Sequence, residues 1–327
     1  MLIPYQNDLS NLQSLDLHAS MAEITNWQGQ QALKLDGLVI IPNLKVTDAK
    51  ISVEIGAEDG CYRGVVFRLA DPANYEMAYA QPHTSGQWDA IQYDPVFHNS
   101  NTWQIFYGPD YQKEALVPMN KWFSMSVDLK GNQAAIRVGD QDPLVVSRLA
   151  HPQNSGLVGL WTYRPAYFRN LCVAGEPSLA EMTAATHPLS PGLVEEWFLN
   201  GFGRVVCEPH GIINVNRYLP ASIKVVRLTR LFEATRKTGI ELCFGFSDKL
   251  SLLLDRKTIF TGQNNFNGFG GWQDRGYVEP DTNRLSVSVS AGIHRLSVVL
   301  RVIEPFGWGF TLALQGKHTI LLPVEMG

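Results

Sequence analysis

The sequence has little charge and no long apolar run. Charged residues make up 18% of the 327 positions, and 27 Lys+Arg against 31 Asp+Glu give a formal net charge of −4. Proteins whose affinity rests on neutralising phosphates need a basic excess, so we expect no nucleic-acid partner. No apolar stretch approaches the roughly 20 residues that span a membrane as a helix. We therefore expect no membrane partner either.

Cysteines are few and scattered. Cys61, Cys172, Cys207 and Cys243 form no C-x-x-C motif and have no metal-like spacing, so we expect buried free thiols rather than disulfides. Residues 1–18 lack the basic start and apolar stretch of a signal peptide. Both absences favour the cytosol, with a secreted chain trimmed of its export signal as the alternative.

The common motifs of metal, nucleotide and nucleophile chemistry are also missing. The chain has no H-E-x-x-H, no EF-hand loop, no Walker loop and no G-x-S-x-G. We expect no cofactor for this reason.

Alternation of polar and apolar residues dominates what is present. It runs through residues 64–70 (GVVFRLA), 122–129 (WFSMSVDL) and 293–302 (IHRLSVVLRV). In the last segment the even-numbered residues share one face, whereas Arg295 and Arg301 point the other way. Short aromatic and β-branched segments divided by turn residues are typical of all-β sandwiches and barrels.

The alternation stops between the two halves of the chain. The segment 174–192 contains three prolines and many small residues, so we predict a linker there, with one helical turn at 178–183. The predicted fold class is all-β, with two β-sandwich (jelly-roll) domains in tandem and very little helix. Their predicted bounds are 1–175 and 193–327, with the linker at 176–192.

Several short motifs follow one another in residues 51–173. They are GVVFR (64–68), NYE (74–76), QPHTSG (81–86), DAIQY (89–93) and GLVGLW (156–161). In this order they resemble the concanavalin A-like lectin/glucanase sandwich, above all its laminin-G-like branch related to hydrolases of 3-keto-disaccharides. The resemblance implies a sandwich fold and a sugar ligand. Laminin-G-like relatives sometimes hold calcium at the sandwich rim, but no part of this chain is acidic enough for us to assign such a site.

Glycan-cleaving members of that superfamily often carry an acidic triplet, E-x-D-x-x-E, which this chain lacks. A glycosidase needs two carboxylates across one cleft, about 5–10 Å apart. Glu76 and Asp89 are the catalytic candidates, because they fall on neighbouring extended segments that a hairpin could set side by side, although the sequence does not give the register. For catalysis we favour the alternative that both are solvated or paired with Arg68 and Arg63 on an exposed face.

Aromatic and planar polar side chains concentrate between residues 75 and 107. Sugars bind to aromatic faces through their C–H groups and to polar side chains through their hydroxyls. Alternation assigns about half of these side chains to the core, and we interpret Trp122 and Trp161 as core residues too. We predict a ligand site on the concave face of the N-terminal sandwich. Its predicted ligand-binding residues are Arg68, His83, Gln92, Tyr93, Trp103 and Gln104.

The second half carries its own set of motifs. INVNRY (213–218), FGFSD (244–248) and FGWGF (306–310) resemble the galactose-binding-like jelly rolls that accompany many bacterial sugar-processing enzymes. The Asn- and Gly-rich segment 263–276 is either a ligand rim or a flap over the sandwich end, and we favour the flap.

Three functions remain open at this point. The first is a carbohydrate-binding protein without chemistry of its own, whose partner is an oligosaccharide or a small sugar. The second is a glycan-active hydrolase, either a glycosidase or a 3-keto-sugar hydrolase, that uses Glu76 and Asp89. The third is a protein-interaction scaffold in which the aromatic residues are core. We favour the first, because it explains both the polar-aromatic strands and the missing acidic triplet. The oligomeric state is not predicted.

Overall fold

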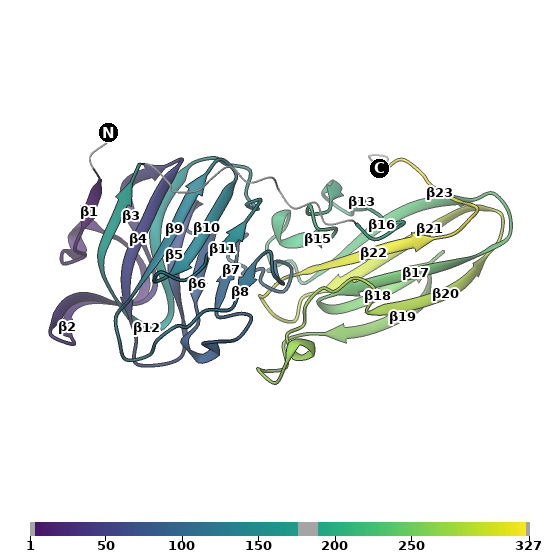
Figure 1. The fold of residues 1–327 in the computed structure, drawn as a ribbon. Helices are drawn as coiled ribbons and strands as arrows, with labels where there is room; N and C mark the ends of the chain where they lie inside the picture. Colours follow the sequence, from purple (N-terminus) through teal and green to yellow (C-terminus); the bar gives the residue numbers. More distant parts are fainter. Residues whose placement is uncertain (1–3, 176–188, 325–327) are drawn as a thin grey trace. The chain divides into compact units, whose positions relative to one another are not determined.

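The computed structural model describes residues 4–175 and 189–324 as a chain of antiparallel strands (Figure 1). The helical elements among these residues are four short 3₁₀ turns: Leu12–Ser14, Pro82–Thr84, Val215–Arg217 and Trp272–Asp274. The predicted all-β class is confirmed. The helical turn expected at 178–183 lies outside the described residues. Within the described ranges, no helix has the length and apolar character needed to cross a membrane.

The chain divides into two compact units. The first comprises Met1–Asn99 and Phe106–Ala185, and the second comprises Ser100–Ile105 and Thr186–Gly327. Alternation along the sequence does not reveal that the six residues of Ser100–Ile105 pack with the second unit.

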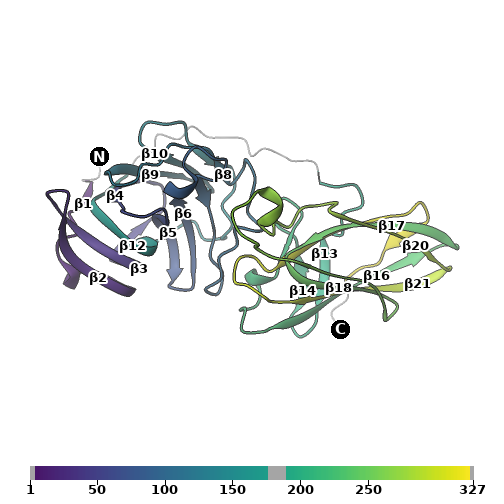
Figure 2. The same ribbon diagram turned by 90° about the horizontal axis from the view of Figure 1, so that it is seen from below.

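Twelve strands of the first unit are joined edge to edge. They are β1 (Tyr5–Asn7), β2 (Asp16–Trp27), β3 (Gln30–Val46), β4 (Ala49–Gly56), β5 (Tyr62–Asp71), β6 (Asn74–Ala80), β7 (Ile91–Tyr93), β8 (Gln112–Lys113), β9 (Phe123–Lys130), β10 (Gln133–Val138), β11 (Leu144–Val146) and β12 (Gly156–Ala174). Figure 2 shows β4, β9 and β10 along one side of this unit and β3, β5 and β6 along the other. These two groups are the layers of a sandwich.

Strand β12 belongs to both layers. Residues 157–163 pair with β3 and β5, and residues 167–174 pair with β4. Between these stretches the register shifts at Thr162/Ala166, and Arg164 has a φ of 74°. Such an irregularity bends a strand and re-aims the side chains after it. One strand thereby continues from the first layer into the second.

The layer formed by β3, β12, β5 and β6 is apolar on both faces. On one face Val65, Phe67 and Leu160 are completely buried. Because the side chains of β5 and β12 that point to this face are not exposed, this face packs against the second layer. The opposite face also carries a hydrophobic cluster, but some of its members are only partly buried. The outer cluster contains Leu38, Ile40, Val66, Leu69, Tyr75, Met77, Tyr79 and Val96, with Tyr62, Leu157 and Trp161 packed against it.

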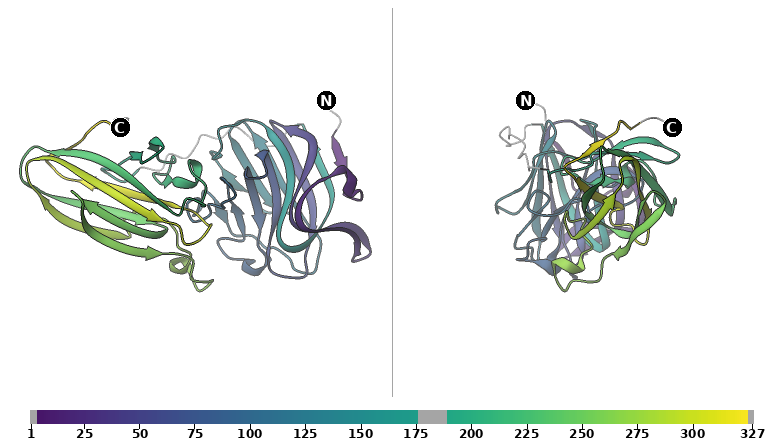
Figure 3. Two further views of the ribbon diagram at one scale, coloured as in Figure 1. Left: turned by 180° about the vertical axis from the view of Figure 1, so that it is seen from behind. Right: turned by 90° about the vertical axis from the view of Figure 1, so that its right-hand side faces the viewer.

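The second unit is a sandwich of two sheets. The larger sheet contains β13 (Glu196–Leu199), β14 (Gly203–Val206), β16 (Val225–Ala234), β18 (Asp248–Leu254), β19 (Lys257–Asn264), β21 (Gly292–Arg301) and β23 (Thr319–Leu321). The smaller sheet contains β15 (Ile213–Asn214), β17 (Thr238–Phe246), β20 (Asn283–Val289) and β22 (Gly309–Gln315). The long strands of this unit, green to yellow in Figure 3, run alongside one another. The predicted alternation of β21 is confirmed, because Leu296, Val298 and Leu300 are buried whereas Arg295 and Arg301 are exposed.

Candidate functional site

The predicted catalytic residue Glu76 lies on β6 and is completely buried. Its Oε2 accepts a hydrogen bond of 2.5 Å from the Tyr93 hydroxyl, and its Oε1 accepts one of 2.8 Å from the backbone N–H of His151. The Tyr93 hydroxyl in turn accepts a bond of 2.8 Å from the backbone N–H of Ala150. Burial, together with the neighbouring Glu76 carboxylate, raises the pKa of Tyr93 well above its ordinary value. Glu76 and Tyr93 thus fasten β6 and β7 to the loop at 150–151.

Asp89 does not lie beside Glu76. Its side chain is 3% exposed, and its backbone carbonyl accepts a hydrogen bond from the side-chain amide of Gln81. Gln81 follows Glu76 by five residues of extended chain, which at about 3.3 Å per residue amounts to roughly 16 Å. Two glycosidase carboxylates are no more than about 10 Å apart. The prediction that a hairpin sets Glu76 and Asp89 side by side is therefore wrong.

Arg68 and Gln92 are also buried, and their polar atoms bond to the protein itself. The guanidinium of Arg68 donates to the carbonyl oxygen of Gly131 and, at 3.5 Å, to that of Gln153. The Gln92 amide donates to the carbonyl oxygens of Tyr93 (2.6 Å) and Phe106 (2.8 Å). Both side chains hold loops against the sheet.

Register explains why the predicted ligand face is not open. Glu76 is the partner of Phe67, and Tyr93 is the partner of Ala78, so both point to the face that packs against the second layer. Arg68 stands at an irregularity of β5, with a φ of 48°. The expected groove of Arg68, Glu76 and Tyr93 is the interior of the sandwich.

Trp103 and Gln104 belong to the second unit. The Trp103 ring lies 5.4 Å from Phe306 and 5.8 Å from Phe266, measured between ring centroids. The buried Gln104 amide donates to the Arg275 carbonyl oxygen (3.0 Å) and to Glu304 Oε1 (2.6 Å). The side chains of Trp103 and Gln104 therefore pack within the second unit.

His83 is the predicted ligand residue that borders an accessible surface. It lies in the Pro82–Thr84 turn, half-buried, with its ring 5.1 Å from that of Tyr62 at an interplanar angle of 81°. The Tyr62 ring also lies 5.4 Å from Tyr79 and 6.3 Å from Tyr163, and Tyr79 lies 5.9 Å from Trp161. We call the set Tyr62, Tyr79, His83, Trp161 and Tyr163 the aromatic face.

Strand order brings the aromatic face together from distant parts of the sequence. Trp161 and Tyr163 point the same way because they are two residues apart on β12, and Gly64 stands between Trp161 and Tyr79 in the register. A Cβ at Gly64 would overlap the carbonyl oxygen of Ala78, so the strand pairing requires glycine there. The row of register partners across β2, β3, β12, β5, β6 and β7 is His18, Leu38, Trp161, Gly64, Tyr79 and Gln92.

The aromatic face is accessible along β12 and β5 and polar at its β2 edge. Tyr163 is 57% exposed, Tyr62 and Trp161 are half-buried, and Tyr79 is 4% exposed. At the edge, His18 Nε2 lies 3.3 Å from Asp16 Oδ1, and both side chains are exposed. Rings beside hydrogen-bonding groups are the chemistry that a saccharide needs.

Sequence reasoning missed Tyr62, Trp161 and Tyr163. The alternation of Trp161 and Tyr163 was a usable signal for a shared face. The alternation did not show which face of the strand is accessible. The intervening residues Leu160 and Thr162 can occupy either a buried or an exposed face, because one is apolar and the other is small.

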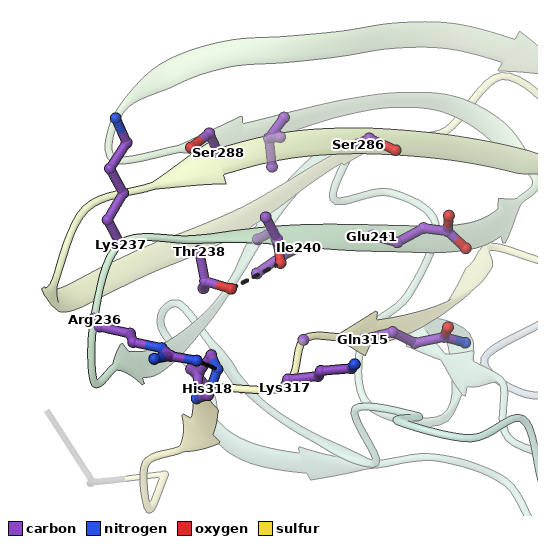
Figure 4. A pocket seen from close by; sticks show the side chains of 13 residues that line it. Arg236, Lys237, Thr238, Ile240, Glu241, Ser286, Ser288, Gln315, Lys317 and His318 are labelled. Carbon is purple, nitrogen blue, oxygen red and sulfur yellow. Dashed lines mark hydrogen bonds between the residues drawn. The ribbon is translucent and has the colours of Figure 1, made fainter.

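The second unit has a shallow hollow of about 890 Å³ on its smaller sheet (Figure 4). Figure 4 shows Glu241 and Gln315 on adjacent strands and Arg236 beside His318, to which it is hydrogen bonded. The Glu241 carboxylate pairs with Arg284 at 3.3 Å. No Phe, Tyr or Trp lines this hollow, so it offers hydrogen-bonding groups without an aromatic platform.

Metal-binding residues do not gather in the described parts of the chain, where no group of three His, Cys, Asp or Glu is placed to hold an ion. All four cysteines are free thiols, with Cys61 and Cys243 buried.

No protein-family model and no curated protein matches the chain. Among solved structures, it is similar to the carbohydrate-binding module CBM66 from Bacillus subtilis, with 14% identity, a TM-score of 0.38, and coverage of 49% of this chain and 95% of that one. A galectin-like protein of unknown function from Bacillus subtilis has 11% identity, a TM-score of 0.39, and coverage of 52% and 94%. The β-glucanase of Bacillus licheniformis has 9% identity, a TM-score of 0.34, and coverage of 53% and 98%. At these identities and TM-scores no residue role transfers to this chain.

Proposed function

We propose that the chain is a carbohydrate-binding protein whose first unit takes an oligosaccharide or small sugar on the aromatic face. The observation that carries the proposal is the accessible set of rings of Tyr62, Trp161 and Tyr163 on one sheet face. Contiguous exposed apolar surface marks ligand-binding grooves among other interaction sites.

Physical chemistry favours a sugar over a purely apolar ligand. A pyranose ring has an apolar face of C–H groups, which lies on an aromatic ring, and a rim of hydroxyls, which needs donors and acceptors. His83 and the exposed pair of His18 and Asp16 supply such groups beside the rings. Binding is favoured over hydrolysis by Glu76 and Asp89, because these two carboxylates are buried and apart.

Binding to a panel of neutral oligosaccharides tests the proposal, followed by calorimetric titration of the best ligand. We expect Tyr163→Ala and Trp161→Ala each to weaken binding about two- to tenfold, since an aromatic contact contributes roughly 0.5–1.5 kcal/mol. Phe202→Ala is the matched control, because Phe202 is a 51% exposed aromatic of the second unit.

Two results would overturn the proposal. One is the absence of binding to any neutral oligosaccharide. The other is a ligand whose affinity is unchanged in both aromatic-face variants while they remain folded.

A further inference from the structure

The larger sheet of the second unit carries a hollow of about 830 Å³ on its outer face. Core residues such as Leu228 alternate with the residues that line it, so the hollow faces away from the sandwich interior. Its floor is one row of register partners across β13, β16, β21 and β18: Phe198, Thr229, Ser297 and Leu253. The floor thus combines an aromatic ring, an alkyl chain and two hydroxyls.

Four arginines line this hollow, and all of its lining residues lie in the described part of the chain. Arg227 and Arg295 point to the same face as the floor, each two residues from it along its strand. Arg256 comes from the turn between β18 and β19, and Arg230 comes from β16. No Asp or Glu is among the lining residues, so the hollow concentrates positive charge.

Arg230 differs from the other three arginines, because it shares the phase of the core residues Leu228 and Phe232 on β16. It is 9% exposed, and its Nε and Nη1 have no hydrogen-bond acceptor in the described structure. It lies where the edge partner of β16 changes from β13, last paired at Thr229, to β23, first paired at Phe232. Burial lowers the pKa of Arg230, as expected for a desolvated cation. A buried cation with unused donors is costly unless an acceptor reaches it.

Two carboxylates outside the lining have partners of their own. Glu196 forms an ion pair with Arg204, and its charge also acts on Arg230. Asp255 Oδ2 lies 2.7 Å from His294 Nδ1, and its Oδ1 accepts a 2.8 Å bond from the backbone N–H of Arg295. The guanidinium groups of the hollow therefore keep their charge available to a ligand.

We infer that this arginine hollow binds a saccharide that carries oxyanion groups, either carboxylate or sulfate. Guanidinium groups recognise both oxyanions through paired N–H donors. Thr229, Ser297 and the exposed Asn200 suit sugar hydroxyls, and the Phe198 ring suits a C–H face. The volume falls within the roughly 300–1,000 Å³ that small-ligand sites occupy. This site is separate from the aromatic face, and it requires a negatively charged ligand.

Calorimetric titration of the full chain tests the inference with three probes: a trisaccharide of galacturonic acid, a sulfated trisaccharide and a neutral trisaccharide. We expect at least one charged probe to bind and to bind about 100-fold more weakly to the double variant Arg227→Gln/Arg295→Gln, since each charge-assisted contact accounts for about tenfold. Arg301→Gln is the matched control, because Arg301 is an exposed arginine of the same strand and does not line the hollow. Which charged probe binds identifies the oxyanion.

Arg230→Gln separates a binding role from a structural one. If Arg230 awaits an anion, this variant keeps or gains thermal stability while losing at least tenfold in affinity for the charged probe. If Arg230 only supports the fold, the variant loses stability and its affinity is unchanged.

Three outcomes would overturn the inference: neither charged probe binds, the neutral probe loses as much affinity in the double variant as the charged one, or Arg301→Gln weakens binding equally. Trp161→Ala is expected to leave binding of the charged probe intact. The two proposed sites can therefore fail independently.

Discussion

The hydroxyl of Tyr93 donates a 2.5 Å hydrogen bond to the carboxylate of Glu76, with both side chains completely removed from solvent. Because the pKa of Tyr93 is raised by burial and by this carboxylate, the phenol keeps its proton and remains the donor. Arg68, whose charge acts on Glu76, lies on the neighbouring strand. The three groups form a polar centre inside the first sandwich, and their role is structural.

Replacing Glu76 by Gln removes the negative charge and turns one of its two accepting oxygens into an NH2 donor. We expect Glu76→Gln to lower the free energy of unfolding by about 2–4 kcal/mol, because Tyr93 and the backbone N–H of His151 lose their charged partner. Urea denaturation measures the loss, with the exposed Glu114→Gln as control. Glycan affinity of the folded fraction is expected to stay unchanged. A urea midpoint of Glu76→Gln equal to that of the wild type would contradict a stabilising role for Glu76.

Glycine at position 64 is expected to be indispensable. Gly64→Ala places a Cβ against the backbone of β6, which cannot yield without breaking the β5–β6 ladder. We expect a loss of about 2–4 kcal/mol, read from the thermal midpoint. Gly239→Ala is the control, because a Cβ there meets nothing within 4 Å. Equal midpoints for the two variants would show that β5 and β6 are spaced differently.

Stability is expected to fall as pH rises from about 4 to about 7, through Asp248. Burial raises the pKa of this carboxyl from 3.8 to about 7, so the folded state holds a proton that the unfolded state has released. Wild-type protein is therefore more stable below this window than above it, by as much as a few kcal/mol. Asp248→Asn keeps the acceptor for the backbone N–H of Glu304 and removes the titration.

Urea denaturation at pH 5 and pH 8 tests whether stability falls as pH rises. We expect the free energy of unfolding of Asp248→Asn to increase relative to that of the wild type as pH rises. Some pH dependence remains in the variant, because burial also raises the pKa of Glu304 and acts in the same direction. Parallel pH profiles for both proteins would refute the assignment.

Trp103→Ala is expected to destabilise the second unit. The indole packs against Phe266, Tyr277 and Phe306, so its removal leaves a cavity worth roughly 2–4 kcal/mol. Hydrogen exchange of residues 263–276 reports the loosening, and affinity for a neutral glycan stays at its wild-type value. Loss of that affinity with unchanged exchange would restore Trp103 as a ligand residue.

The architecture was predictable because period-two alternation is local. His294, Leu296, Val298 and Leu300 of β21 are buried as their pattern indicates, and the same holds for Val65 and Phe67 on β5. Predicting an all-β fold requires no knowledge of which strands are neighbours.

The site was less predictable because it depends on register and on which face another layer covers. Both phases of β5 and β6 are buried, so alternation alone assigns Glu76 to either face. The irregularity at Arg68 then exchanges the faces within one strand. Trp161 lies about 100 residues from Tyr62 in sequence, and only the pairing of β12 with β5 makes them neighbours.

The membership of Ser100–Ile105 in the second unit bears on how this protein can be dissected. A fragment starting at residue 186 lacks the indole of Trp103 and the amide of Gln104, and leaves Phe266 and Phe306 bare to water. A fragment ending at residue 185 retains that hexapeptide without its packing partners. Cutting the chain between residues 185 and 186 therefore gives two incomplete fragments with exposed apolar side chains, so ligand-binding experiments on either half require the intact polypeptide.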